Sequence, residues 1–254
     1  MTSLRRDREA AFHDAAFADD RRAPLGRFYA VASDARGLYR SLIEGAATGC
    51  TVLELGCGKG EQALRLGRIG ATVHGVDISP TGVGIARQRA LAMGLADRVS
   101  FSVMDGHALG WPDATFDLVC GSGILHHLEI QVGLREIVRV LKSAGRAVFL
   151  EPMAHNPAIR LFRVLTPSLR SRDEHPLSVA DVRRLRACFG TGTERYFGLT
   201  SLLAAPFVGA PGGRHCACLL QRLDRVLLRL PCLRPLAWMV VLELREPAKA
   251  GMPG

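Results

Sequence analysis

From residue 51 onward, short apolar runs alternate with amphipathic stretches along the chain. Short apolar runs are typical of strands buried in a parallel sheet, and amphipathic stretches between them are typical of crossover helices. The pattern therefore predicts an α/β domain. The predicted strands are 51–55, 72–76, 99–103, 116–120, 147–151, 193–197 and 238–244, and the predicted helices are 61–68, 81–93, 132–141, 178–188 and 215–230.

Two segments stand apart from this alternation. Residues 1–49 are rich in Ala, Arg and Asp and predict an N-terminal helical cap on a single domain spanning 50–254. The apolar segment 199–230 forms an insertion before the last strand, and its arginines occupy a different helical face from its leucines. Two interpretations of this insertion stay open: a helix packed on the sheet, or an apolar lid that can contact a membrane surface.

Composition limits the class of protein. A chain of 254 residues with 48% hydrophobic and 22% charged residues is typical of one globular domain. The N-terminus lacks the apolar stretch of a signal peptide, and no run reaches the roughly 20 apolar residues that span a bilayer. The seven cysteines have no paired ligand spacing, so we expect buried thiols in a cytoplasmic protein and no metal.

The net charge of +9 comes almost entirely from arginine. A basic balance can indicate nucleic acid, an anionic membrane surface or an acidic substrate. Here the arginines are dispersed, without a dense basic tract and interleaved aromatic residues. We therefore expect a solvated basic surface and no specific nucleic-acid partner, with a peripheral membrane contact as an alternative.

The strongest chemical signal is the run Val-Leu-Glu-Leu-Gly-Cys-Gly-Lys-Gly at 52–60, in which an apolar strand leads into three glycines and a helix. Glycines let the backbone turn tightly against a ligand, and the helix N-terminus then faces that ligand. The dinucleotide fingerprint G-x-G-x-x-G requires glycine at 61, where this chain has Glu61. A carboxylate at position 61 would repel the pyrophosphate of a dinucleotide, whereas S-adenosylmethionine has no phosphate. Glu54, at the strand end, can face the cationic methionyl end of that cofactor.

Two further acids follow predicted strands. Asp77 in Gly-Val-Asp-Ile-Ser ends the second strand, where a carboxylate can accept both ribose hydroxyls of an adenosine. Asp105 in Met-Asp-Gly ends the third strand and can bind the adenine amino group, with a helix cap as the alternative. Ligands of open α/β sheets bind outside the carboxyl ends of the strands. Three acids and a glycine turn at those ends therefore indicate a nucleoside-like cofactor.

The series V-L-E-L-G-C-G-K-G, G-V-D-I-S, M-D-G, F-D-L-V-C, G-I-L-H-H-L and R-V-L-K-S-A-G-R resembles the class I S-adenosylmethionine-dependent methyltransferase family over about residues 50–151. It is most similar to the small-molecule branch related to ubiquinone and menaquinone biosynthesis. The resemblance implies S-adenosylmethionine as cofactor and a Rossmann-like seven-stranded sheet of order 3-2-1-4-5-7-6. The candidate cofactor-binding residues are Glu54, Gly56, Cys57, Gly58, Gly60, Asp77, Ile78, Asp105, Gly106 and Gly121.

Methyl transfer is an in-line displacement, so the protein mainly positions the acceptor, and a base is needed only for an acceptor that holds its proton. The fourth strand is followed by His126 and His127, without the [D/N]-P-P-[Y/F] motif of enzymes that methylate exocyclic amino groups. At most one of two adjacent histidines faces an acceptor, and packing is the alternative for each. His127 is favoured because related quinone-pathway O-methyltransferases have a histidine in a similar L-E-H-V context. His126 replaces the acidic neighbour of that motif, which argues against a metal.

Further candidates lie near the predicted strand ends. Glu151 ends the fifth strand and is a third candidate catalytic residue. His155, His175 and Tyr29 are candidate acceptor-binding residues, although polar residues beside proline also form turns.

The leading hypothesis is methyl transfer to a small, hydrophobic acceptor such as a quinone, an aromatic compound, a polyketide or a lipid-like metabolite. Two alternatives remain: an RNA or protein methyltransferase, suggested by the net charge, and a non-catalytic cofactor-binding partner in a biosynthetic complex. Glu61 disfavours a dinucleotide oxidoreductase.

Overall fold

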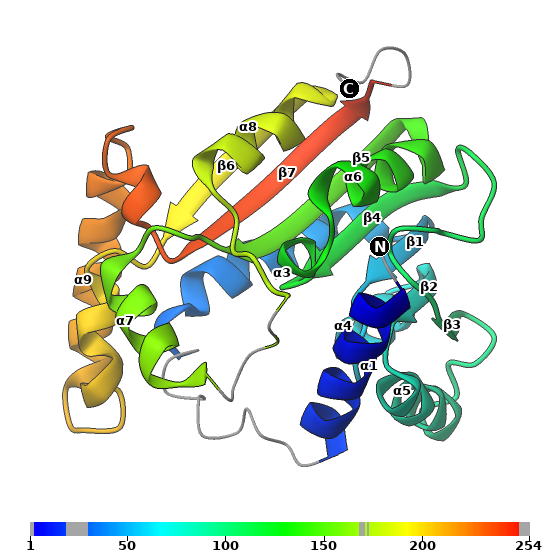
Figure 1. Ribbon diagram of the computed structural model, residues 1–254, viewed down its shortest axis with the longest axis horizontal. Coiled ribbons are helices and arrows are strands. Elements are labelled where there is room, and N and C mark those ends of the chain that lie inside the picture. Colours follow the sequence, from blue (N-terminus) through cyan, green and yellow to red (C-terminus); the bar gives the residue numbers. More distant parts are fainter. Residues whose placement is uncertain (1–2, 19–29, 168–170, 172, 249–254) are drawn as a thin grey trace.

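The computed structural model describes residues 3–18, 30–167, 171 and 173–248. Its core is a seven-stranded sheet of order β3-β2-β1-β4-β5-β7-β6, flanked by helices (Figure 1). The strands are β1 Thr51–Leu55, β2 Thr72–Asp77, β3 Val99–Val103, β4 Phe116–Ser122, β5 Leu141–Pro152, β6 Phe189–Phe197 and β7 Met239–Pro247. The predicted fold class and strand order are confirmed.

Helices connect β1 to β2, β2 to β3 and β4 to β5, whereas β4 follows β3 without a helix in the described residues between them. The helices are α1 Ser3–Ala18, α3 Ser33–Ala47, α4 Glu61–Arg68, α5 Pro80–Ala92, α6 Ile130–Val140, α7 Pro157–Leu165, α8 Val179–Ala187 and α9 Gly213–Leu227. Short 3-10 helices are η2 Leu125–His127, η4 Ser201–Phe207 and η5 Arg234–Leu236. Within the described residues, no helix has the length and hydropathy of a membrane span.

The sheet has a hydrophobic core on each face. On one face, α3, α4 and α5 bury residues such as Ile43, Leu66 and Ala86 against the strands. On the other face, α6 and α8 contribute Ile137 and Leu185. Strands β1 to β5 run parallel and β7 pairs antiparallel with both of its neighbours, so the carboxyl ends of β1, β2 and β4 gather at one edge.

The observed boundaries differ from the predicted ones mainly around β5. The strand begins at Leu141, which pairs with Phe116, and an irregularity in the register follows on β4. Lys142 Nζ donates to an Asp117 carboxylate oxygen at 2.8 Å across the two strands. The charged residues after α6 therefore extend the strand, although their polarity is typical of a turn. Helix α7 was not predicted; Asn156 caps it by accepting from the backbone N–H of Ile159.

Candidate active site

Two adjoining cavities lie at the carboxyl ends of the central strands. The smaller, of about 210 Å³, is lined by seven of the predicted site residues, Gly56, Gly58, Asp77, Ile78, Asp105, Gly106 and His127. The larger, of about 560 Å³, is lined by Glu54 and Cys57. Both cavities have His13, Phe17 and Ser122 in their walls, so they adjoin under α1, and we call the two cavities together the hollow.

The glycine turn after β1 holds the backbone against this hollow. Gly56 and Gly58 have φ angles of +67° and +48°, a region that disfavours residues with a side chain. A Cβ at Gly58 would approach the Phe17 ring to 3.1 Å. Gly60 does not line either cavity, and a Cβ there would lie 2.7 Å from Phe101, so this glycine permits helix packing. The turn thus contains two glycines that line the smaller cavity and one that permits close packing of the helix.

Asp77 fixes the same turn from the neighbouring strand. Its Oδ2 accepts from the Gly58 N–H at 2.8 Å, and its Oδ1 accepts from the Ser79 N–H at 2.9 Å. Burial raises the pKa of Asp77, while these two backbone hydrogen bonds oppose that shift. The carboxylate therefore fixes the shape of the cavity wall that it lines.

Glu54 is a buried acid near the end of β1. Its side chain is 6% exposed, and its Oε2 has no hydrogen-bond partner among the described residues. Burial, and then the nearby carboxylates of Asp77 and Glu61, raise the pKa of Glu54 to about 8. A buried acceptor left unsatisfied is unfavourable. A cationic ligand group beside Glu54 would stabilise its ionised carboxylate.

Asp105 is held by a residue that the sequence analysis did not single out. Its Oδ1 accepts from both the backbone N–H and Nδ1 of His107, the latter at 2.5 Å. His107 Nε2 accepts from the Glu129 N–H at 2.7 Å, which assigns the proton to Nδ1. Burial raises the pKa of Asp105, but the His107 hydrogen bonds outweigh burial and lower it. Asp105 is thus an ionised acceptor on the cavity wall.

The two adjacent histidines of η2 differ in their surroundings. Glu151 is 0% exposed, and its Oε1 accepts from the backbone N–H groups of Ile124 and Leu125, both at 2.9 Å. Its Oε2 lies 2.8 Å from His126 Nδ1. Glu151 and His126 line neither cavity, whereas His127 lines the smaller one. Glu151 therefore shapes the turn that carries His127.

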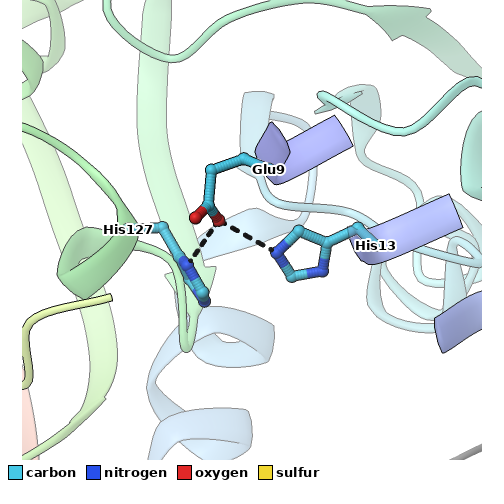
Figure 2. A group of neighbouring side chains, drawn as sticks. All are labelled: Glu9, His13 and His127. Carbon is cyan, nitrogen blue, oxygen red and sulfur yellow. Dashed lines mark hydrogen bonds and ion pairs between the residues drawn. The ribbon is translucent and has the colours of Figure 1, made fainter. Parts of the chain in front are cut away.

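Helix α1 brings a carboxylate and a third histidine to His127 (Figure 2). Glu9 Oε2 lies 3.0 Å from His127 Nδ1 and 3.6 Å from His13 Nε2. Burial raises the pKa of Glu9, but hydrogen bonds with His127 and His13 outweigh it and hold this pKa well below its usual range. Burial lowers the pKa of His127, and Glu9 only partly opposes that shift. The pair is therefore an ionised carboxylate and a neutral imidazole.

Several contacts tie α1 to both sides of the hollow. Arg5 donates to the backbone oxygens of His127 and Asp173, each at 3.1 Å. At the other end, Asp14 accepts from the Ser79 hydroxyl and from the Thr81 N–H. Helix α1 thus bridges η2 and the start of α5 above the cavities.

Glu174 joins the histidines from the far side. Its Oε2 lies 4.0 Å from the Nε2 atoms of both His126 and His127, and its Oε1 lies 2.7 Å from Arg163 Nη2. Two overlapping groups, Glu9 with His13 and His127, and Glu174 with His126 and His127, bring ligand atoms close enough together to hold a metal ion. The sequence does not mark Glu9 or Glu174 as site residues, because each lies far along the chain from the histidine turn.

The remaining predicted residues do not line either cavity. His155 and His175 are exposed, and the buried residue beside His155 is the helix cap Asn156. Gly121 precedes the cavity-lining Ser122, and a Cβ at Gly121 would lie 2.9 Å from the Leu55 carbonyl oxygen. Tyr29 lies outside the described residues.

The sheet order with an antiparallel β7 defines a class I methyltransferase fold. Residues 53–149 match the family model described as "Methyltransferase domain". The matched segment is therefore similar to a methyltransferase domain, and the sheet topology agrees with that similarity.

Known relatives cover part of the chain. Aklanonic acid methyltransferase DauC of Streptomyces sp. (strain C5) is 39% identical over 111 residues, which are 42% of this chain and 50% of the relative. Ubiquinone/menaquinone biosynthesis C-methyltransferase UbiE of Geobacter sulfurreducens is 35% identical over 119 residues, 45% of this chain and 46% of the relative. The chain therefore spans half or less of these relatives' length.

A solved structure extends the likeness in fold. Geranyl diphosphate C-methyltransferase from Streptomyces coelicolor A3(2), in complex with Mg²⁺, geranyl diphosphate and S-adenosyl-L-homocysteine, superposes with a TM-score of 0.61. The match covers 84% of this chain and 80% of that chain at 15% sequence identity. At this identity the comparison concerns the fold alone.

Proposed function

We propose that this chain catalyses methyl transfer from S-adenosylmethionine to a small, hydrophobic metabolite. The observation that supports the proposal most is Glu54, which has a buried, unpartnered Oε2 and lines the larger cavity, next to the smaller cavity that Asp77 lines. When bound, the cofactor supplies an electrophilic methyl group on a sulfonium. Glu54 would pair with its ammonium group, and Asp77 would accept from the ribose hydroxyls. Both roles suit a cationic nucleoside and disfavour a pyrophosphate ligand.

The adenine end would lie near Asp105 and Ile78, which line the smaller cavity. Asp105 is an ionised acceptor and would bind the exocyclic amino group, while Gly56 and Gly58 allow close approach of the backbone. Cys57 adds a buried thiol at the larger cavity, and burial raises its pKa well above the usual range. This thiol therefore contributes packing and not a nucleophile.

His127 would act on the acceptor. Its Nδ1 is committed to Glu9, so its other ring nitrogen can take a proton from an acceptor hydroxyl as the oxygen forms its bond to the methyl carbon. The products are a methyl ether, S-adenosylhomocysteine and an imidazolium stabilised by the Glu9 carboxylate. Glu151 and His126 are proposed as positioning residues for this turn.

The acceptor class is supported by the relatives' names, which include enzymes of aklanonic acid and of ubiquinone and menaquinone biosynthesis. We therefore propose a hydrophobic aromatic, quinone, polyketide or lipid-like acceptor rather than RNA or protein.

Binding and transfer can be tested separately. Calorimetry should detect S-adenosylmethionine and S-adenosylhomocysteine at micromolar levels and NADH poorly. Asp77→Ala should weaken cofactor binding by about 1–3 kcal/mol because it strands polar groups, whereas the exposed-site control Asp97→Ala should not. Tight NADH binding without binding of S-adenosylmethionine would refute the cofactor assignment.

For transfer, the chain is incubated with methyl-labelled cofactor and a panel of hydroxyquinones and aromatic polyketides. Labelled product and S-adenosylhomocysteine, followed by mass spectrometry, support the proposal. Labelling of RNA or protein, with no labelled small molecule, would assign the activity to the alternative class.

A further inference from the structure

Exposed apolar side chains concentrate on one part of this molecule. They lie on α7, η4, α9 and the turn after α9, which gather at one end of the structure (Figure 1). We call these residues the α7–α9 surface: Leu161, Val164, Leu165, Leu203, Phe207, Leu219, Leu223, Val226 and Leu230. Contiguous exposed apolar surface on a globular protein usually marks an interaction site.

The register of α9 explains why its apolar stripe faces outward. Asp224 is buried, and its carboxylate accepts hydrogen bonds from backbone and hydroxyl groups of Thr200 and Ser201 and from the Leu199 N–H. Ala217 lies on the same buried side of the helix. These contacts fix the rotation of α9 about its axis.

With that rotation fixed, the leucine stripe points to solvent. Leu219, Leu223 and Val226 follow i, i+4 and i+7 spacing on one helical face. Leu219 is 64% exposed and Val226 is 59% exposed. Packing of this stripe on the sheet, one of the two interpretations that the sequence allowed, would require these side chains to be buried.

Helix α7 carries a second exposed apolar stripe. Val164 is 76% exposed, and Leu161 and Leu165 are exposed on the same side. Ile159 of α7 and Ala217 of α9 belong to one small core cluster together with Trp238. The shared cluster places both helices at the same end of the fold, so their exposed stripes belong to that end (Figure 1).

The charged side chains that α7 and α9 themselves expose are arginines. Helix α9 and the turn after it carry exposed arginines at 214, 222, 225 and 229, and α7 carries exposed Arg160. Asp224 is the one acid in the sequence of α9, and it is buried; the α7 sequence has none. Arg225 also pairs with Asp34 at 3.3 Å. The exposed apolar side chains are thus bordered by cations.

We infer that the α7–α9 surface binds the surface of an anionic lipid membrane. An apolar helical stripe flanked by arginines is the pattern of interfacial helices, whose apolar side chains enter the boundary between headgroups and acyl chains. The arginines would contact lipid phosphates, and the attraction would be screened by salt. An anionic membrane offers negatively charged phosphates above an apolar layer, in one plane. A protein partner would need acidic groups around an apolar groove to match the same surface.

The test is sedimentation of the full chain with vesicles, and it does not depend on the proposed methyl transfer. We expect binding to phosphatidylcholine vesicles containing phosphatidylglycerol, weak binding to phosphatidylcholine alone, and loss of binding as salt is raised. Leu219→Asp with Val226→Asp should reduce vesicle binding at least about tenfold, because each charge must then enter an apolar layer. Arg222→Glu should weaken binding to the anionic vesicles only.

The matched control is Leu91→Asp on α5, since Leu91 is 69% exposed and lies outside the α7–α9 surface. It should bind vesicles like the unchanged chain. All variants should keep their thermal transition and their affinity for S-adenosylmethionine, which separates failure of this inference from failure of the proposed function. Equal vesicle binding by the double variant and the control, or no binding to anionic vesicles, overturns the inference. Self-association that the double variant abolishes would instead assign the surface to a second copy of the chain.

Discussion

Glu9 and His127 are separated by 118 positions in the sequence, yet their side chains meet with 3.0 Å between Glu9 Oε2 and His127 Nδ1. The contact joins α1 to the turn that follows β4, at the wall of the smaller cavity. A carboxylate on one ring nitrogen fixes the tautomer and orientation of a histidine and leaves the other nitrogen as the proton acceptor. The base proposed for this site therefore depends on the N-terminal helix.

The pair predicts how turnover responds to substitution. His127→Ala should lower kcat and kcat/KM together by about 10²–10⁴-fold, the usual contribution of a positioned base. Glu9→Gln should lower them less. Since the Glu9 carboxylate raises the pKa of His127, the acidic limb of the pH–rate profile should move to lower pH in Glu9→Gln. Cofactor affinity, measured by calorimetry, serves as the control. A loss below tenfold in His127→Ala would assign this histidine to packing.

Glu54 predicts proton release when the cofactor binds. With its pKa raised to about 8, this carboxyl is mostly protonated at pH 7 in the free protein. Pairing with a cationic ammonium group stabilises the carboxylate and displaces the proton. Calorimetry at pH 7 in two buffers of different ionisation enthalpy should therefore measure close to one proton released. Glu54→Gln should bind more weakly and release none, whereas unchanged release in that variant would contradict the assignment.

Glu151 predicts a cost in stability rather than a selective loss of catalysis. It has three hydrogen-bond partners around η2, and its removal strands buried donors. Glu151→Ala should lower the free energy of unfolding by about 1–3 kcal/mol, measured by urea denaturation. Glu129→Ala, at an exposed acid close by on the same loop, is the matched control. If Glu151→Ala keeps full stability but has reduced turnover, Glu151 has a direct catalytic role instead.

We expect methyl transfer to proceed without a metal ion. Two groups of side chains around His127 have the spacing to hold one. However, Glu174 already pairs with Arg163 at 2.7 Å, and Glu9 Oε2 already bonds His127. A cation would have to compete with both contacts. Activity should survive EDTA followed by desalting; activity that is lost and then restored by Zn²⁺ or Mg²⁺, but not restored in Glu174→Gln, would establish a metal site instead.

The sequence by itself determined the α/β fold class and the residues at the carboxyl ends of the first strands. Strands β1 and β3 have the predicted bounds, because a buried apolar run in β1 and an alternation of apolar and polar residues in β3 both leave a local signal. The glycine turn and Asp77 were also identified locally, since a tight turn needs glycine at a definite place in the chain. Their roles in binding the cofactor stay predictions.

Only the tertiary structure decided which residues meet across long sequence separations. Glu9 and Glu174 carry no local mark that distinguishes them from surface acids, yet packing brings both to His127. The same holds for α9: its sequence pattern allowed its leucines to face the sheet, and buried Asp224 turned them toward solvent. Periodicity fixes which residues share a helical face, whereas the rotation of that face depends on hydrogen bonds and packing made with distant parts of the chain.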